Sequence, residues 1–132
     1  MNLLIISVVL FGHWLSDFIL QKNKIKPTKN KKEKIKRILK HLFPHTLYYS
    51  LIMSSLVTLL YFCNIFGAQY WWASFLFFII TYITHFIVDF TITLINSNYL
   101  SKNKRHLYFI TIGLDQFLHY VLLFWSINLI YF

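Results

Sequence analysis

The stretch that decides the fold is FLFFIITYITHFIVDF, residues 75–90. Its apolar residues are almost continuous, whereas a strand of a membrane β-barrel would carry a polar residue at every second position. The stretch belongs to an apolar run over residues 70–95, long enough for an α-helix, which crosses ~30 Å of hydrocarbon with ~20 residues. The run therefore predicts a transmembrane helix, although it contains two ionisable residues, His85 and Asp89.

Three further apolar runs of similar length cover residues 2–21, 42–63 and 107–132. The chain has 132 residues, of which 58% are hydrophobic and 13% charged, whereas an average soluble domain has ~45–50% and ~25%. We therefore predict an all-α, polytopic membrane protein. Its residues 1–132 would form a single transmembrane domain, a bundle of four membrane-spanning helices.

The basic residues are concentrated in two connections between the runs. Ten of the thirteen Lys and Arg lie within residues 22–40, and the other three lie within residues 102–105. The positive-inside rule places both connections in the cytoplasm and both termini outside it. We predict a cell (inner) membrane protein whose basic cytoplasmic loop, residues 22–40, contacts anionic lipid headgroups. No nucleic-acid partner is expected, because no aromatic residue interrupts the lysine run to stack on a base, and oligomerisation is left open.

The ionisable residues inside the apolar runs share one spacing. Three of the four acidic residues lie four positions from a histidine, and the second run opens with two histidines four apart. An i, i+4 spacing puts both side chains on one face of a helix. In the predicted topology the pairs form two layers: Asp17, His41, Asp89 and Asp115 nearer the cytoplasm, and His13, His45, His85 and His119 one turn deeper.

Three aspartates in the membrane are costly, at ~2.5–3.5 kcal/mol each near a helix centre. His–Asp pairing, a water-filled cavity or a bound cation would offset this cost. Imidazole and carboxylate ligands suit zinc, manganese or iron, and eight ligands are too many for one tetrahedral ion. We therefore predict two divalent transition-metal ions bound by these eight residues. Gln21 and Gln116, which adjoin them, are candidates to hold the ligands in place by hydrogen bonds.

This pattern favours a metal-dependent hydrolase that acts on a lipid-linked or cytoplasmic ester or phosphoester. Asp17 and Asp115 would be its catalytic carboxylates, because an anionic ligand balances the metal charge and aids deprotonation of bound water. Two other functions stay open. The same residues could relay protons or pass a metal ion in a transporter. In a non-enzymatic membrane effector or interaction protein they would only form interhelical hydrogen bonds.

The two halves of the chain also resemble each other. HWLSDF at 13–18 matches HFIVDF at 85–90, and HLFPHT at 41–46 aligns with DQFLHY at 115–120. These matches indicate a parallel internal repeat, with the polar site on an axis along the membrane normal.

Four motifs carry a resemblance to a known family: HWLSDFILQ (13–21), HLFPH (41–45), THFIVDF (84–90) and LDQFLH (114–119). The chain resembles a family of small bacterial and phage integral-membrane proteins known only as a domain of unknown function, over nearly its whole length. It is more loosely similar to inner-membrane metal-dependent hydrolases, in residue type and layout but in no single motif. The first resemblance implies a membrane protein and supplies no activity.

Overall fold

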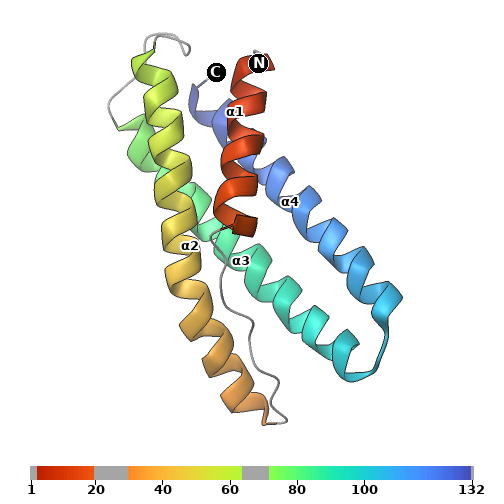
Figure 1. The fold of residues 1–132 in the computed structure, drawn as a ribbon. Helices are drawn as coiled ribbons and strands as arrows, with labels where there is room; N and C mark the ends of the chain where they lie inside the picture. The colour runs from red at the N-terminus through yellow and green to blue at the C-terminus, as the bar shows by residue number, and fades with distance from the viewer. Residues whose placement is uncertain (1–2, 20–29, 64–71, 132) are drawn as a thin grey trace.

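The computed structural model describes residues 3–19, 30–63 and 72–131, and nearly all of the described residues are helical, with no strand among them. The elements are α1 (Leu3–Trp14), a π-helical turn η1 (Leu15–Ile19), α2 (Lys31–Phe62), α3 (Ala73–Ser101) and α4 (Arg105–Tyr131). The prediction of an all-α chain with four helices is thus confirmed. The start of α1 and the end of α4 lie at one end of the molecule, and the start of α2 and the α3–α4 turn lie at the other (Figure 1).

The start of α2 corrects one predicted boundary. We expected the apolar helix from residue 42, with an amphipathic lead-in marked by the helical spacing of Ile35, Ile38, Leu39 and Leu42. α2 in fact begins at Lys31, so the second half of the segment predicted as a loop, residues 22–40, is helical. The Asn30 side chain caps this helix by accepting hydrogen bonds from the backbone N–H groups of Lys32 (3.0 Å) and Glu33 (3.4 Å). Glu33 also pairs with Arg37 one turn later. Lys and Arg are good helix formers, so their density does not interrupt a capped helix.

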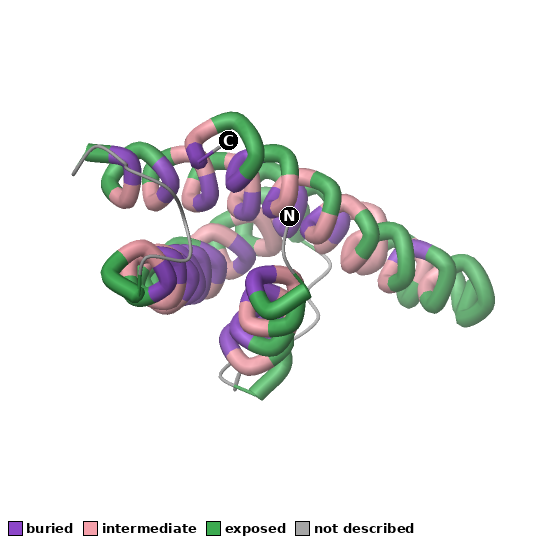
Figure 2. Tube along the Cα trace, turned by 90° about the horizontal axis from the view of Figure 1, so that it is seen from above, coloured by how far each residue is buried: buried purple, intermediate pink, exposed green. Residues whose placement is uncertain are grey.

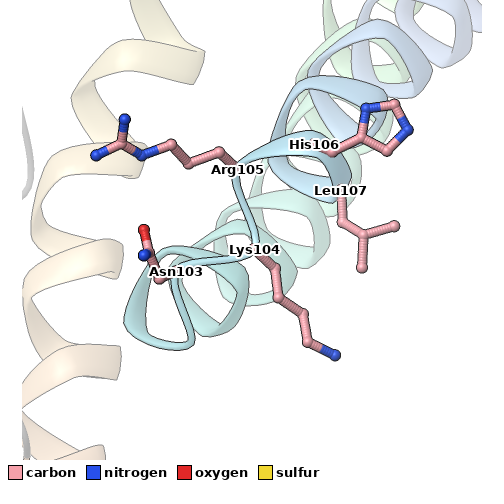
Figure 3. A pocket seen from close by; sticks show the side chains of 5 residues that line it. All are labelled: Asn103, Lys104, Arg105, His106 and Leu107. Atoms are coloured by element: carbon pink, nitrogen blue, oxygen red, sulfur yellow. The ribbon is translucent and has the colours of Figure 1, made fainter.

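The α3–α4 turn is short and brings these two helices together as a hairpin. Asn103 adopts a left-handed backbone conformation (φ 53°), which asparagine tolerates better than most residues. The backbone N–H of Lys104 then donates to the carbonyl of Tyr99 at 2.9 Å. Asn103, Lys104, Arg105, His106 and Leu107 line an open pocket here, and the Lys104 and Arg105 side chains point to opposite sides of the turn (Figure 3).

The apolar core lies in the half of the bundle that contains the start of α1 and the end of α4. It takes side chains from all four helices: Ile5, Val9, Tyr49, Met53, Val57, Leu60, Ala73, Phe77, Leu123, Ile127 and Tyr131. Gly12 lets α1 approach α2 closely, because a Cβ at this position would overlap the side chain of Leu56. This close approach brings the next residue, His13, against α2.

The outward faces of the helices are exposed (Figure 2), and many of the residues on them are large and apolar. Large exposed hydrophobic residues include Phe11, Phe18, Leu51, Leu59, Phe75, Ile87, Phe109, Phe117 and Trp125. Soluble monomers rarely expose contiguous apolar patches larger than a few hundred Å². α3 and α4 are long and apolar enough to cross a membrane, and Leu3–Ile19 forms a shorter apolar helix.

Candidate metal centre

Most of the predicted ligands converge next to the apolar core, on the side that faces the start of α2 and the α3–α4 turn. Their ligand atoms form three sets, and within each set all ligand atoms lie within 4.8 Å of one another. The four-ligand group contains Asp17, His45, His85 and Asp89; the three-ligand group contains Asp89, Asp115 and His119; the His13 group contains His13, Asp17 and His119. Buried His and Asp residues that could hold a metal ion are therefore present in this chain.

The four-ligand group combines residues from three elements. Asp17 comes from η1, His45 from α2, and His85 and Asp89 lie one turn apart on α3. His45 Nε2 lies 3.1 Å from Asp17 Oδ1 and 3.5 Å from Asp89 Oδ2. His85 Nε2 lies 3.8 Å from Asp17 Oδ1, 3.2 Å from Asp89 Oδ2 and 3.4 Å from His45 Nε2.

These five separations correspond to five of the six edges of one coordination tetrahedron. Ligand atoms at 2.0–2.1 Å from a tetrahedral zinc ion lie about 3.3–3.4 Å from one another. The measured distances, from 3.1 to 3.8 Å, bracket that value. All four side chains are buried, so solvent contributes little to stabilising the two carboxylates. The donor set and its spacing therefore suit one zinc-sized cation.

The second oxygens of the two shared aspartates point toward the other sets. Asp89 Oδ1 lies 3.2 Å from His119 Nε2, and Asp17 Oδ2 lies 3.9 Å from His13 Nε2. On α4, Asp115 Oδ1 lies 3.7 Å from His119 Nδ1. Asp17 and Asp89 can thus each face two neighbouring positions, as carboxylates that bridge two metal ions do.

Several of these buried atoms lack a hydrogen-bond partner among the described residues: His85 Nδ1, Asp89 Oδ2, Asp115 Oδ1, and Nδ1 and Nε2 of His119. Close approach without hydrogen-bond alignment leaves lone pairs unsatisfied, and each such buried group costs ~1–3 kcal/mol. A bound cation would satisfy the atoms that face the sets. The residues present therefore fit a metal centre.

Tyr49, a residue that the sequence analysis did not single out, joins the site from α2. Its ring stacks on His85 with a centroid separation of 3.7 Å and an interplanar angle of 11°. Its hydroxyl lies 2.7 Å from His13 Nδ1. Tyr49 follows His41 and His45 at the same spacing of four, so the helical face that predicted those two residues could have identified it.

Gln116 connects α4 to α1 and η1. Its Oε1 lies 3.0 Å from His13 Nε2, and its Nε2 donates to Asp17 Oδ2 at 3.2 Å. Together with Tyr49 these contacts form a continuous path from the apolar core to Asp17. Gln116 thus contacts both His13 and Asp17, and its role in orienting ligands stays a prediction.

The π-helical turn η1 carries Asp17. The Ser16 hydroxyl donates to the backbone carbonyls of Gly12 (2.7 Å) and His13 (3.2 Å). Such back-bonding competes with the helical hydrogen bonds, at the place where the α-helical spacing changes. Single π-turns are frequent at functional sites, and this one sets the position of Asp17 relative to His13.

One predicted ligand lies apart from these sets. His41 is half-buried on α2 and belongs to none of the three sets. It lies one turn nearer the basic end of the bundle, which the start of α2 and the α3–α4 turn form. Its role as a ligand stays a prediction. Gln21 lies outside the described residues.

The comparisons with known proteins bear on the resemblance carried by the motifs. A family model for DUF3307, described as a protein of unknown function, matches residues 5–131. The chain belongs to the DUF3307 family. The match spans all of the predicted site residues and confirms the resemblance to a domain of unknown function. No curated protein and no solved structure matches the chain, so the looser likeness to metal-dependent hydrolases gains no support.

The family description names no function, so the site of this DUF3307 protein is described from its geometry alone. It contains a buried cluster of His and Asp side chains at the level where α1, η1, α2, α3 and α4 meet. The described Lys and Arg residues, at the start of α2 and in the α3–α4 turn, lie at one end of the bundle, and the apolar core lies at the other.

Proposed function

We propose that this DUF3307 protein is an integral membrane metalloprotein that hydrolyses an ester or phosphoester. The observation that carries the proposal is the four-ligand group, whose buried donor atoms have the spacing of a tetrahedral zinc site. Without a cation, the two buried aspartates would depend on histidine pairing and, for Asp17, on one hydrogen bond from Gln116. Zinc, manganese or iron suits this mixture of imidazole and carboxylate.

The membrane part of the proposal has four spans, with both termini outside the cytoplasm and the basic residues inside it. α3 and α4 supply two spans by length and composition. The apolar outward faces of α1 and α2, with Phe11 and Leu51 among their exposed residues, support the other two. The Lys- and Arg-rich start of α2 would lie at the cytoplasmic headgroups, where each basic residue contributes ~1 kcal/mol of attraction to anionic lipid.

The orientation can be tested with the native cysteine. Cys63 is free and exposed at the C-terminal end of α2, opposite the basic end of the bundle. In intact cells a membrane-impermeant maleimide is expected to label Cys63. Cysteine introduced by Lys104→Cys in a Cys63→Ser background should react only after the cells are permeabilised. The reverse pattern would show that the basic end faces outward and would refute the proposed topology.

The chemistry assigned to the chain is metal-assisted hydrolysis with two ions. Bound metal ions would lower the pKa of a coordinated water and polarise the phosphoryl or carbonyl oxygen of the substrate. Asp17 would orient its ligand oxygen through its hydrogen bond with Gln116. Asp115, with a side chain that is 19% exposed, is the most accessible of the three aspartates and is placed to accept a proton from solvent or substrate.

The test compares hydrolysis with ion flux on one preparation. Purified protein loaded with zinc or manganese would be assayed with phospholipid, isoprenoid-phosphate and nucleotide substrates, and in proteoliposomes for metal and proton flux. We expect product formation that Asp17→Asn and Asp115→Asn each reduce by more than about 100-fold, because even outer partners of metal ligands contribute 10–100-fold. Glu33→Gln, at the exposed fourth acidic residue, is the matched control and should keep full activity.

Two results would contradict the hydrolase. Metal-dependent flux without hydrolysis of any substrate class would identify the cluster as an ion pathway. Wild-type behaviour of both aspartate variants in both assays would leave these residues a structural role only.

A further inference from the structure

We infer that His13 is a positioning residue and not a metal ligand, and that the second ion of the proposed centre is held by the three-ligand group with an open coordination position beside Asp115. The inference rests on the proposed metal centre for its second part. Its first part follows from hydrogen bonds alone.

The direction of the hydrogen bonds around His13 is fixed by Asp17. An ionised carboxylate only accepts, so the Gln116 group 3.2 Å from Asp17 Oδ2 must be the amide NH₂. The amide oxygen then faces His13 Nε2 at 3.0 Å, and an oxygen can only accept there. His13 Nε2 must therefore carry the proton. In the neutral ring Nδ1 has a lone pair, which accepts the Tyr49 hydroxyl proton at 2.7 Å.

The chain of donors thus runs one way, from Tyr49 to His13, from His13 to Gln116 and from Gln116 to Asp17. Both ring nitrogens of His13 are occupied, and its side chain is fully buried. His13 can bind a metal through Nε2, the nitrogen 3.9 Å from Asp17 Oδ2, only if it breaks its bond to Gln116 and changes tautomer. Binding through Nδ1 would break the hydrogen bond from Tyr49. His13 therefore lies near the other members of the His13 group without acting as a ligand. It influences Asp17 through its hydrogen bond to Gln116.

The internal repeat shows what this arrangement replaces. The four-ligand group takes one histidine from α2, an aspartate from η1, and a His–Asp pair from α3. Its counterpart under the repeat would take His119 from α4, Asp89 from α3, and the pair His13 and Asp17. Strict symmetry would therefore use His13 as a ligand of the second ion.

Three positions break the symmetry, and all three act on this second position. Tyr49 aligns with Leu123, and Gln116 aligns with Leu42. His13 therefore has hydrogen-bond partners at both ring nitrogens, whereas the repeat places leucines at the equivalent positions around His85. Asp115 aligns with His41, and it lies in the three-ligand group while His41 lies in no set. The changes remove His13 from the second position and supply Asp115 instead.

The two positions then differ in coordination. The four-ligand group offers four protein atoms, which closes a tetrahedral site, whereas the three-ligand group offers three. Structural zinc sites are typically closed, and catalytic ones keep one position for water or substrate. The unpartnered atoms of His119 and Asp115 lie in the three-ligand group. The open position lies beside Asp115, which is more exposed than His119.

Metal stoichiometry tests the second part. Detergent-purified protein would be titrated with zinc and its metal content measured per chain. Wild type and Glu33→Gln should bind two ions, Asp115→Asn only one, and His13→Gln two, with affinity lower by about 10–100-fold as for other residues that orient ligands. Two ions in Asp115→Asn together with one in His13→Gln would overturn the assignment.

The tautomer of His13 tests the first part in metal-free wild-type protein, and a variant is needed only to assign the signal. Nitrogen-15 NMR of histidine-labelled wild type, with His13 assigned by its absence in His13→Gln, should show a proton on Nε2 and none on Nδ1. A proton on Nδ1 would overturn the positioning role. Failure of wild type to bind any zinc would refute the proposed function, and the tautomer measurement would still stand.

Discussion

Replacing Asp89 by asparagine is expected to abolish metal binding altogether. Asp89 Oδ2 belongs to the four-ligand group and Asp89 Oδ1 faces His119, so one carboxylate serves both positions. Asparagine has almost the same shape, but its amide is neutral and offers only one oxygen. Loss of a bridging anion should therefore weaken both positions by more than the 10–100-fold typical of outer partners.

Elemental analysis of the purified proteins measures this directly. Glu33→Gln makes the same chemical change at an exposed carboxylate that pairs with Arg37 at the basic end, and it should keep the wild-type metal content. An Asp89→Asn protein that is folded and still carries two ions would show that the centre does not depend on this carboxylate.

Removing the metal is expected to lower stability strongly. Metal-free protein leaves Asp89 Oδ2 and both ring nitrogens of His119 buried without hydrogen-bond partners among the described residues, and each such group is costly. Free zinc at about a thousand times its dissociation constant stabilises a folded protein by ~4 kcal/mol. For a chain of this size that corresponds to roughly 10 °C or more in the unfolding midpoint.

Thermal unfolding in detergent, with zinc or with a chelator, gives the measurement. The wild-type midpoint should fall on chelation, whereas the Asp89→Asn midpoint should be the same in both conditions because it has no site to fill. A wild-type midpoint that does not respond to zinc would mean that the histidines and aspartates stabilise one another without a cation.

Much of this fold could be predicted from the sequence because its signals are periodic. Long apolar runs predict helices, and the i, i+4 spacing of His85 and Asp89 fixes the helical face that both occupy. Helices that bury such faces must bring them together, so convergence of the pairs follows from patterning. The helical spacing of Ile35, Ile38, Leu39 and Leu42 indicates an amphipathic lead-in to the second apolar run. The start at Lys31 could not be predicted from that spacing, because it precedes the first of these apolar residues.

The finer arrangement of the site could not be predicted from spacing. An i, i+4 pair defines a face of a helix, but it does not define where along the helix the neighbouring helices come close. His45 therefore lies in one of the three sets, whereas His41, one turn away on the same face, lies in none. The role of Tyr49 depends on its stacking on His85 and its bond to His13, and both are contacts between different helices. The separation of His13 from the ligands likewise depends on an amide whose orientation only the assembled bundle defines.

The length of α2 determines what the basic end can reach. Its 32 residues span about 48 Å at 1.5 Å per residue, about 18 Å more than ~30 Å of hydrocarbon. In the proposed orientation this surplus carries Lys31 and Lys32 through the headgroups into the aqueous phase. Their field extends over a Debye length of ~8 Å at physiological ionic strength. The lysine-rich first turns of α2 would therefore attract dissolved anions. Added salt would shorten the distance over which this attraction acts, whereas it would leave the interactions within the buried His and Asp cluster unaffected.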